Sequence, residues 1–366
     1  MTDFLSQTGN FFFMLCAFLL VLGPLVFFHE FGHFIAARLC GVGVEVFSIG
    51  FGPRLFGKKR GRTDYRISAV PLGGYVKMTG DDFTAEIEPE DIPYSFVHAH
   101  VAKRMLIAVA GPAFNMLLAF FIFSALLLYS GSYEYLPDPV IGEVRKDSPA
   151  KAAGLQKGDR ILSINGEKVK TWKEMSNLIT TSTQGTELSI SVLRKESEVD
   201  IHVTPEKISE KNHLGETIER YIIGITASGR EVRLGPIQAI AQGFTVTFEI
   251  TRISIVGIIK MIEGKVSVKE NLGGPIIIAK VSGDVARKGI AKLMEWGALL
   301  SISLAILNIM PIPILDGGHL LFCLIEILIR RPVSIKIREV ATQAGFFLLL
   351  MLVVFVFYND IARILN

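Results

Sequence analysis

The feature that most constrains this chain is an uncharged run that leads directly into a His-Glu-x-x-His motif. Residues 11–28 carry no charged side chain, and His29-Glu30-Phe31-Gly32-His33 follows without a break. About this many apolar residues span the hydrocarbon core of a bilayer. Ionisable groups at that depth are costly, and they usually face a bundle interior or a wet cavity and mark function. The sequence therefore predicts a first membrane span whose end contains candidate functional residues.

The motif itself predicts a zinc site. Positions i and i+4 share one face of a helix, so His29 and His33 can reach a single Zn²⁺. Glu30 points just off that face, where it can take a proton from a metal-bound water instead of binding the metal. The alternative is a pair of histidines and a glutamate that are merely hydrogen-bonded on a buried helix end. The membrane setting favours the zinc interpretation.

Composition agrees with a membrane protein and excludes other classes. Half of the residues are hydrophobic and the mean hydropathy is +0.44. A net charge of +3 is too small to imply a nucleic-acid partner. The three cysteines, Cys16, Cys40 and Cys323, lie in or beside apolar runs and indicate neither a disulfide framework nor a Cys-based zinc site. The first apolar run lacks a basic leader and a cleavage site, so we expect it to be retained.

Charge asymmetry between loops predicts the topology. Six basic residues follow the first span between positions 54 and 66, whereas the ten residues before Phe11 contain none. The positive-inside rule places this loop in the cytoplasm and the N-terminus outside. Further spans are predicted near residues 105–129, 295–308 and 340–358. Residues 236–263 show one apolar and one polar face, which favours an amphipathic helix in the membrane interface.

Two segments near the predicted spans favour roles in the site. Residues 65–78, YRISAVPLGGYVKM, contain two strand-like runs around Pro71 and Gly73-Gly74 and predict a hairpin. Its edge could pair with an extended substrate, although a hairpin that only plugs the bundle is the alternative. In the second span, Asn115 is expected to pack between helices or to support the metal helix. His98 and His100 are interpreted as interfacial and structural.

A second break at membrane depth supplies a carboxylate. Pro311 and Pro313 cannot continue a helix, so residues 308–315 must unwind, which is tolerated only inside protein or beside a wet cavity. Asp316 stands where the helix resumes. It is either an N-cap or a third zinc ligand, and as a ligand it would leave the fourth position for water. His319 is placed in a supporting position beside this site.

A polar insertion separates the second and third spans. Strand-like runs at residues 140–144, 160–164, 188–193 and 199–203 surround a segment rich in turn residues. That segment contains Ser148-Pro149-Ala150, Ala153-Gly154-Leu155, Gly158-Asp159 and Ile164-Asn165-Gly166, and it resembles a PDZ domain. In that family a peptide adds as a strand to an exposed sheet edge.

The whole chain resembles the bacterial site-2 protease family, in its envelope-stress branch with a periplasmic PDZ insertion. The resemblance is carried, besides the PDZ pattern, by HEFGH at 29–33, PLGGYVKM at 71–78, AGPAFN at 110–115, NLGGP at 271–275 and NIMPIPILDGG at 308–318. It implies that His29, His33 and Asp316 bind Zn²⁺ and that Glu30 is the catalytic base. It also implies that Asn308 contacts the substrate main chain and that the loop with Gly73, Gly74 and Tyr75 presents it.

These observations predict an α-helical polytopic membrane protein with four transmembrane helices, a membrane-associated β-hairpin loop and an inserted periplasmic PDZ domain of α+β class. The expected divisions are residues 1–135 (two spans, zinc motif and hairpin), 136–234 (PDZ), 235–290 (interfacial helix and linker) and 291–366 (two spans and the Asp316 motif).

The predicted function is intramembrane zinc-dependent cleavage of single-span proteins in a bacterial inner membrane, with the active site toward the cytoplasm. The resemblance implies an anti-sigma factor, first trimmed by another protease, as the substrate. A zinc-binding PDZ receptor or scaffold without protease activity, and a metal transporter, are the alternatives. The lipid bilayer is an expected partner, and nucleic acid is not.

Overall fold

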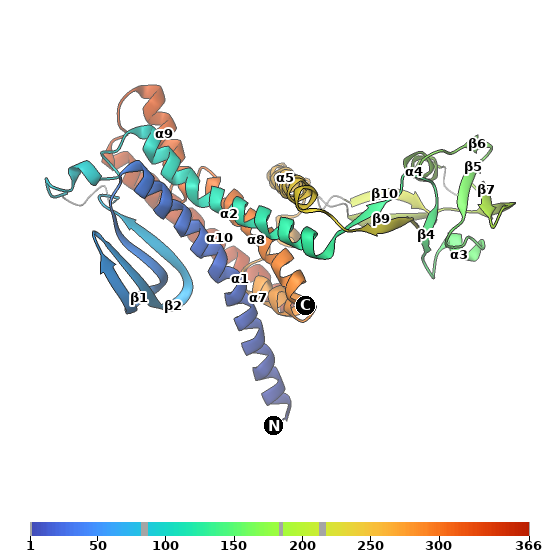
Figure 1. Cartoon of the computed structure of the whole chain (residues 1–366), viewed down its shortest axis with the longest axis horizontal. Helices are drawn as coiled ribbons and strands as arrows, with labels where there is room; N and C mark the ends of the chain where they lie inside the picture. The colour runs from blue at the N-terminus through green and yellow to red at the C-terminus, as the bar shows by residue number, and fades with distance from the viewer. Residues whose placement is uncertain (1, 82–86, 183–185, 212–216, 366) are drawn as a thin grey trace. The chain divides into compact units, whose positions relative to one another are not determined.

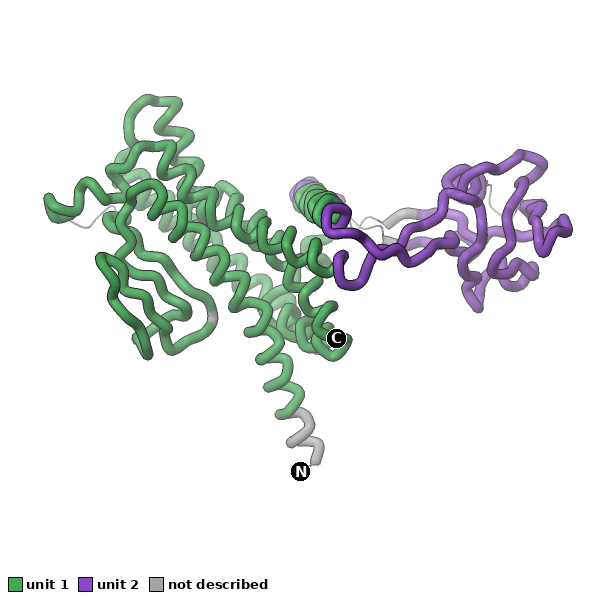
Figure 2. Tube along the Cα trace, in the orientation of Figure 1, with its two compact units in different colours: residues 1–126, 240–258, 267–366 green, residues 127–239, 259–266 purple. Residues whose placement is uncertain are grey.

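The chain divides into two compact units, which are described separately. The structure is a computed structural model that describes residues 2–81, 87–182, 186–211 and 217–365. One unit, here called the membrane unit, comprises residues 1–126, 240–258 and 267–366. The other, the strand-rich unit, comprises residues 127–239 and 259–266 (Figures 1 and 2).

Four described helices of the membrane unit are long and apolar enough to cross a bilayer. They are α1 (Thr2–Cys40), α2 (Val101–Ser130), α8 (Ile290–Ile309) and α10 (Ile335–Leu365). Helix α10 illustrates why they need lipid, because Phe346, Phe347 and Met351 are each more than half exposed. Such an apolar surface is unstable in water. The predicted multi-pass membrane protein is therefore confirmed.

Three further helices separate the strand-rich unit from α8. Helix α5 (Pro236–Ile262) is amphipathic and is not among the described candidate spans, as the sequence predicted. Helices α6 (Val268–Asn271) and α7 (Pro275–Ala286) follow it. Helix α7 packs against α1 and α8, where the indole nitrogen of Trp296 donates to the Ser282 hydroxyl at 3.0 Å. The segment expected as a linker thus contains a helix of the bundle.

Strands β1 (Val44–Arg60) and β2 (Thr63–Met78) follow α1 and form an antiparallel sheet. Both are irregular, so that Phe47 pairs with Tyr65 on one side and with Val76 on the other. The expected hairpin within residues 65–78 is wrong. Its two runs belong to one strand and both pair with β1, whereas the turn lies at Gly61-Arg62. Gly73, at φ +136°, lets the chain cross between the two edges of β1 instead of turning back on itself.

The strand-rich unit is built around a four-stranded sheet in the order β6-β5-β7-β8. Its strands are β5 (Arg160–Ile164), β6 (Glu167–Lys168), β7 (Leu188–Arg194) and β8 (Ser197–Val203), which confirms three of the predicted runs. The fourth run is β4 (Ile141–Val144), which pairs with β11 (Ile225–Ala227). Ile161, Ile190 and Met175 are almost fully buried in the core of this unit.

Short elements complete the described chain. Within the strand-rich unit they are α3 (Pro149–Ala152), α4 (Trp172–Thr180), the pair β3 (Ser132–Tyr135) and β12 (Gly229–Val232), and the pair β9 (Glu206–Lys211) and β10 (Thr217–Ile222). In the membrane unit, the short helix η1 (Ile92–Tyr94) precedes α2, and α9 (Asp316–Ile329) lies between α8 and α10.

Candidate metal centre

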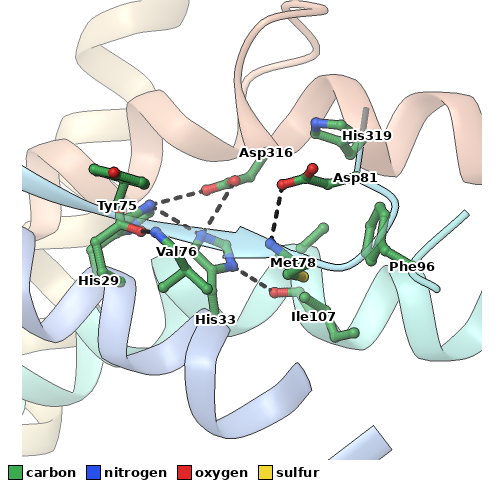
Figure 3. Close-up of a pocket in the computed structure, with 12 residues that line it drawn as sticks. His29, His33, Tyr75, Val76, Met78, Asp81, Phe96, Ile107, Asp316 and His319 are labelled. Atoms are coloured by element: carbon green, nitrogen blue, oxygen red, sulfur yellow. Dashed lines mark hydrogen bonds and ion pairs between the residues drawn. The ribbon is translucent and has the colours of Figure 1, made fainter. Parts of the chain in front are cut away.

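Three side chains from two distant helices meet in the membrane unit. His29 and His33 lie one turn apart on α1, and Asp316 is the first residue of α9. Each imidazole Nε2 faces the carboxylate, with His29 at 3.2 Å from Oδ2 and His33 at 3.3 Å from Oδ1 (Figure 3). The two Nε2 atoms are 3.2 Å apart. The three predicted ligands thus converge within 4.8 Å of one another.

The hydrogen bonds of the two rings point their Nε2 atoms inward. His33 Nδ1 lies 2.8 Å from the carbonyl oxygen of Ile107 on α2. A carbonyl can only accept, so Nδ1 carries the proton and Nε2 of neutral His33 presents a lone pair. His29 Nδ1 lies 3.2 Å from the buried side-chain amide of Asn115. The amide nitrogen Nδ2 is the atom in contact and can only donate, so Asn115 orients the His29 ring but does not place a proton on its Nδ1.

Small residues allow α1 and α2 to approach closely enough for these contacts. An added Cβ on Gly111 would lie 2.3 Å from His33 Nε2 and 2.8 Å from His29 Cε1. An added Cβ on Gly32 would lie 2.4 Å from the carbonyl oxygen of Ala110. Both imidazoles therefore occupy space that a side chain on α2 would fill. The absence of a side chain at Gly111 thus leaves the room that the histidines occupy.

Asp316 is presented by the break in the helix that the prolines impose. Regular helix stops at Ile309 and resumes at Asp316, as expected. The N-cap of α9 is Leu315, and no side-chain cap bond forms there, so the structure does not use Asp316 as a cap. An added Cβ on Gly317 would lie 2.2 Å from the Ile309 oxygen, and one on Gly318 would lie 2.4 Å from Pro313 Cα. The two glycines let α9 start directly against the unwound backbone.

The donor set fits a zinc ion. Two imidazole nitrogens and one carboxylate oxygen match the ligands of catalytic zinc, which keeps a further position for water or substrate. Asp316 Oδ2 is buried; it lies 3.2 Å from His29 Nε2 but accepts no hydrogen bond within the described part of the chain. A buried carboxylate oxygen without a donor is costly, and a cation would satisfy it.

Glu30 lies beside this cluster and touches the sheet. Its Oε2 accepts a hydrogen bond of 2.9 Å from the backbone N–H of Val76. The segment containing Val76 pairs with β1 along one edge, so its other edge faces the metal helix. An added Cβ on Gly74 would lie 3.6 Å from Glu30 Cγ, and Tyr75 lines the same cavity of about 430 Å³. The predicted base and the predicted presenting strand are therefore neighbours.

The other residues that the sequence analysis singled out lie at different distances from the group of His29, His33 and Asp316. Asn308, near the end of α8, places its amide nitrogen 3.4 Å from His29 Nε2. His319 lines the cavity and packs edge-on against Phe96, with ring centroids 6.2 Å apart (Figure 3). His98 contacts the Ser95 hydroxyl, and His100 accepts from the backbone N–H of Ala102. These last two histidines stay apart from the metal group, as their interfacial interpretation expected.

Sequence reasoning missed two contributors to this cavity. The carbonyl of Ile107 gives no signal in a sequence, because every residue has one. Asp81 follows β2 and accepts from the Met78 N–H at 3.1 Å, and burial raises the pKa of its carboxyl. An acidic residue directly after the GGYVKM run was a usable signal.

A candidate span carries the His-Glu-x-x-His motif, and its two imidazoles meet a distant carboxylate beside Glu30; this donor set is typical of zinc hydrolases. The chain belongs to peptidase family M50, the site-2 protease family, and is a zinc metalloprotease: the model of this family matches residues 17–352.

Relatives from several bacteria match over nearly their whole length. A protein from Mesorhizobium japonicum with the provisional name zinc metalloprotease is 38% identical to this chain. The match covers 95% of this chain and 98% of the relative. One from Campylobacter jejuni, with the same provisional name, is 38% identical and covers 96% and 94%. Zinc metalloprotease RasP of Geobacillus kaustophilus is 33% identical and covers 95% and 97%.

Proposed function

We propose that this chain is an intramembrane endopeptidase that cleaves membrane-spanning segments of other proteins. His29, His33 and Asp316 hold the zinc ion, and Glu30 is the catalytic base. The observation that carries the proposal is the convergence of three ligand atoms, from α1 and from the start of α9, within 4.8 Å. Because α1 is a candidate span, the reaction takes place in the membrane.

Glu30 moves the proton. A zinc ion held by His29, His33 and Asp316 would supply Lewis acidity for the scissile carbonyl and for the attacking water. The Glu30 carboxylate takes the proton from the attacking water and delivers it to the leaving amine. Val76 holds one carboxylate oxygen through its N–H, which orients Glu30 and leaves the other oxygen to accept a proton.

The substrate binds as an extended strand. A helix hides its carbonyls in internal hydrogen bonds, so the cleaved segment must unwind before its carbonyl can reach the zinc. The open edge at Gly74 and Tyr75 provides backbone partners for such a segment, with Gly73 shaping the approach and Asn308 contacting the main chain near His29. Substrates with Gly, Pro or Asn in the span should be cut faster than spans of leucine, because they unwind more readily.

The decisive test of the chemistry is Glu30→Gln. An amide cannot accept the proton, so cleavage should fall by about 10²–10⁴-fold while bound zinc and thermal unfolding stay unchanged. Membrane proteins that accumulate in a strain carrying this variant would identify the substrates, which we expect to include a single-span regulator such as an anti-sigma factor. A variant with wild-type cleavage would remove Glu30 from the mechanism. If neither form cleaves any membrane protein, the chain is a zinc-binding receptor.

The strand-rich unit acts as a PDZ domain that controls access. Support comes from its four-stranded sheet, from helix α4 and from a groove of about 370 Å³ lined by α4 and residues 222–226. A steric filter would exclude substrates with bulky outer domains until another protease has trimmed them. Replacing residues 139–205 with a Gly/Ser linker should then allow cutting of the untrimmed substrate and leave the rate on the trimmed one similar. Loss of both activities in a zinc-loaded protein would mean that the unit recruits substrate.

The orientation follows from loop charge. The basic β1–β2 sheet and the α9–α10 loop face the cytoplasm of an inner membrane, and the PDZ unit faces the periplasm. A single cysteine at Lys168 should be labelled from outside, and cysteines at Lys59 or Lys336 only after permeabilisation. External labelling at Lys336 would mean that α5 crosses the bilayer.

A further inference from the structure

A second cavity of the membrane unit lies away from the metal centre. It has a volume of about 750 Å³ and shares no lining residue with the metal-centre cavity. The segment leading into α2 forms one wall, and the end of α9 with the loop into α10 forms the other. In Figure 1 these segments meet beside the label of α9. The cavity is therefore a candidate site that the proteolytic chemistry does not use.

A buried ion cluster forms part of the wall. The carboxylate of Glu326 on α9 accepts hydrogen bonds from Arg104 on α2 and from Arg338 on α10. All three side chains are at most one-tenth exposed. Two guanidinium groups and one carboxylate carry a formal net charge of +1. Arg104 and Arg338 both line the adjoining cavity, so their positive charge favours an anion over a cation there.

Two more arginines increase the positive charge at this cavity. Arg330 and Arg331 stand in the α9–α10 loop, both are exposed, and both line the cavity. Neither forms an ion pair within the described residues. Glu326 is the one acidic side chain among the described lining residues, against four arginines. Guanidinium groups match phosphate oxygens with paired donors, so this set suits a phosphate group.

The position of the cavity selects the source of that phosphate. Both α2 and α10 are candidate spans, and both begin at the cavity. Exposed apolar side chains lie close in sequence to its lining residues, with Leu328 80% exposed, Ile337 60% and Val340 59%. The cavity therefore lies where the apolar surface of two spans ends, which is the level of lipid head groups. Basic pockets between spans at this level bind anionic head groups.

We propose that this cavity binds the phosphate group of an anionic phospholipid. The bound lipid would join α2, α9 and the start of α10 through their arginines. Helix α2 holds His33 through the Ile107 carbonyl, and α9 begins with Asp316. Occupancy would therefore steady the two helices that position the zinc ligands.

The test uses the full-length protein, stripped of native lipid in neutral detergent, at fixed ionic strength. Phosphatidylglycerol, phosphatidylcholine and inorganic phosphate are titrated in parallel, with bound lipid counted by native mass spectrometry and stability followed by thermal unfolding. We expect one tightly retained phosphatidylglycerol and a rise in Tm that phosphatidylcholine does not give. The test variant is Arg330→Gln with Arg331→Gln, because both side chains are exposed and their loss leaves the buried cluster intact.

The matched control removes the same charge elsewhere. Lys58→Gln with Lys59→Gln alters two exposed cations of β1, outside the cavity. An arginine near an anionic surface contributes roughly fivefold in affinity. The double arginine variant should therefore bind phosphatidylglycerol roughly 30-fold more weakly, and the double lysine variant should bind it nearly as well as the wild type. Equal losses in both variants, or equal binding of phosphatidylcholine, would overturn the site. Stabilisation by inorganic phosphate as strong as that by the lipid would show that the ligand is a free anion and not a phospholipid.

Discussion

Replacing Gly111 by alanine should disable the metal centre, although Gly111 supplies no ligand. The new Cβ would lie 2.3 Å from His33 Nε2, whereas ordinary contact begins at 3.4 Å, so the ring must retreat by about 1.1 Å. The ring cannot simply turn away, because Ile107 holds its Nδ1. If α1 moved away from α2, the contacts of His33 with the Ile107 carbonyl and of His29 with Asn115 would both be lost. A displacement of about 1 Å at a reacting centre costs on the order of 100-fold in rate, and disturbed ligand support costs about 10–100-fold in metal affinity.

The assay is zinc affinity, measured by competition with a chromogenic chelator, together with cleavage of a single-span substrate. Gly23→Ala is the matched control, since Gly23 lies on α1 and its added Cβ would meet nothing within 4 Å. The control should keep wild-type zinc affinity and cleavage. Thermal unfolding of both variants separates a damaged site from a damaged fold. Wild-type zinc affinity and cleavage in Gly111→Ala would refute the packing of the two imidazoles against α2.

Three further substitutions test contacts in the same unit. Asp360→Asn should lower the free energy of unfolding by about 1–3 kcal/mol in denaturant, because the buried carboxylate accepts from the N–H groups of Gly274, Ile276 and Ile277. Asp284→Asn, at an exposed side chain of α7, should leave it unchanged. Glu326→Gln should lower the free energy of unfolding by about 3–5 kcal/mol, because it leaves Arg104 and Arg338 buried without their carboxylate. The control Glu339→Gln, at an exposed side chain, should change it little. His33→Ala should lose most of the bound zinc by elemental analysis, and His98→Ala or His100→Ala should keep it.

The residues of the metal centre could be predicted because two of them stand in a short local motif and the third follows a recognisable break in a helix. A spacing of four residues places His29 and His33 on one helix face, and that spacing needs no knowledge of the fold. The two prolines before Asp316 predicted the unwound segment for the same reason. What local patterns could not supply was the partner across the bundle. The break in the helix left Asp316 as either a cap or a third ligand, the resemblance to a known family implied the ligand, and the structure brings the three side chains together.

The sheet beside the site was harder to predict because register depends on long-range pairing. Residues 65–78 contain turn residues that predict a hairpin, yet both halves pair with β1. Nothing in the run itself reveals that residues 46–49 occupy the space between them. Glu326 is a different case. It interrupts the apolar run 320–329, and a carboxylate in such a run signals a buried partner, so its pairing with arginines was open to prediction from the sequence.

The arrangement of the ligands indicates that the protein, and not the ion, sets the geometry of the metal centre. His33 is held by a carbonyl of α2, His29 by Asn115, and Asp316 by the glycines that press α9 against the unwound backbone. Each restraint is a packing contact or a hydrogen bond that the protein itself supplies. This differs from small zinc domains, in which metal binding supplies the folding energy. A protease would benefit from the difference, because side chains positioned in advance would hold zinc without rearranging the helices around it.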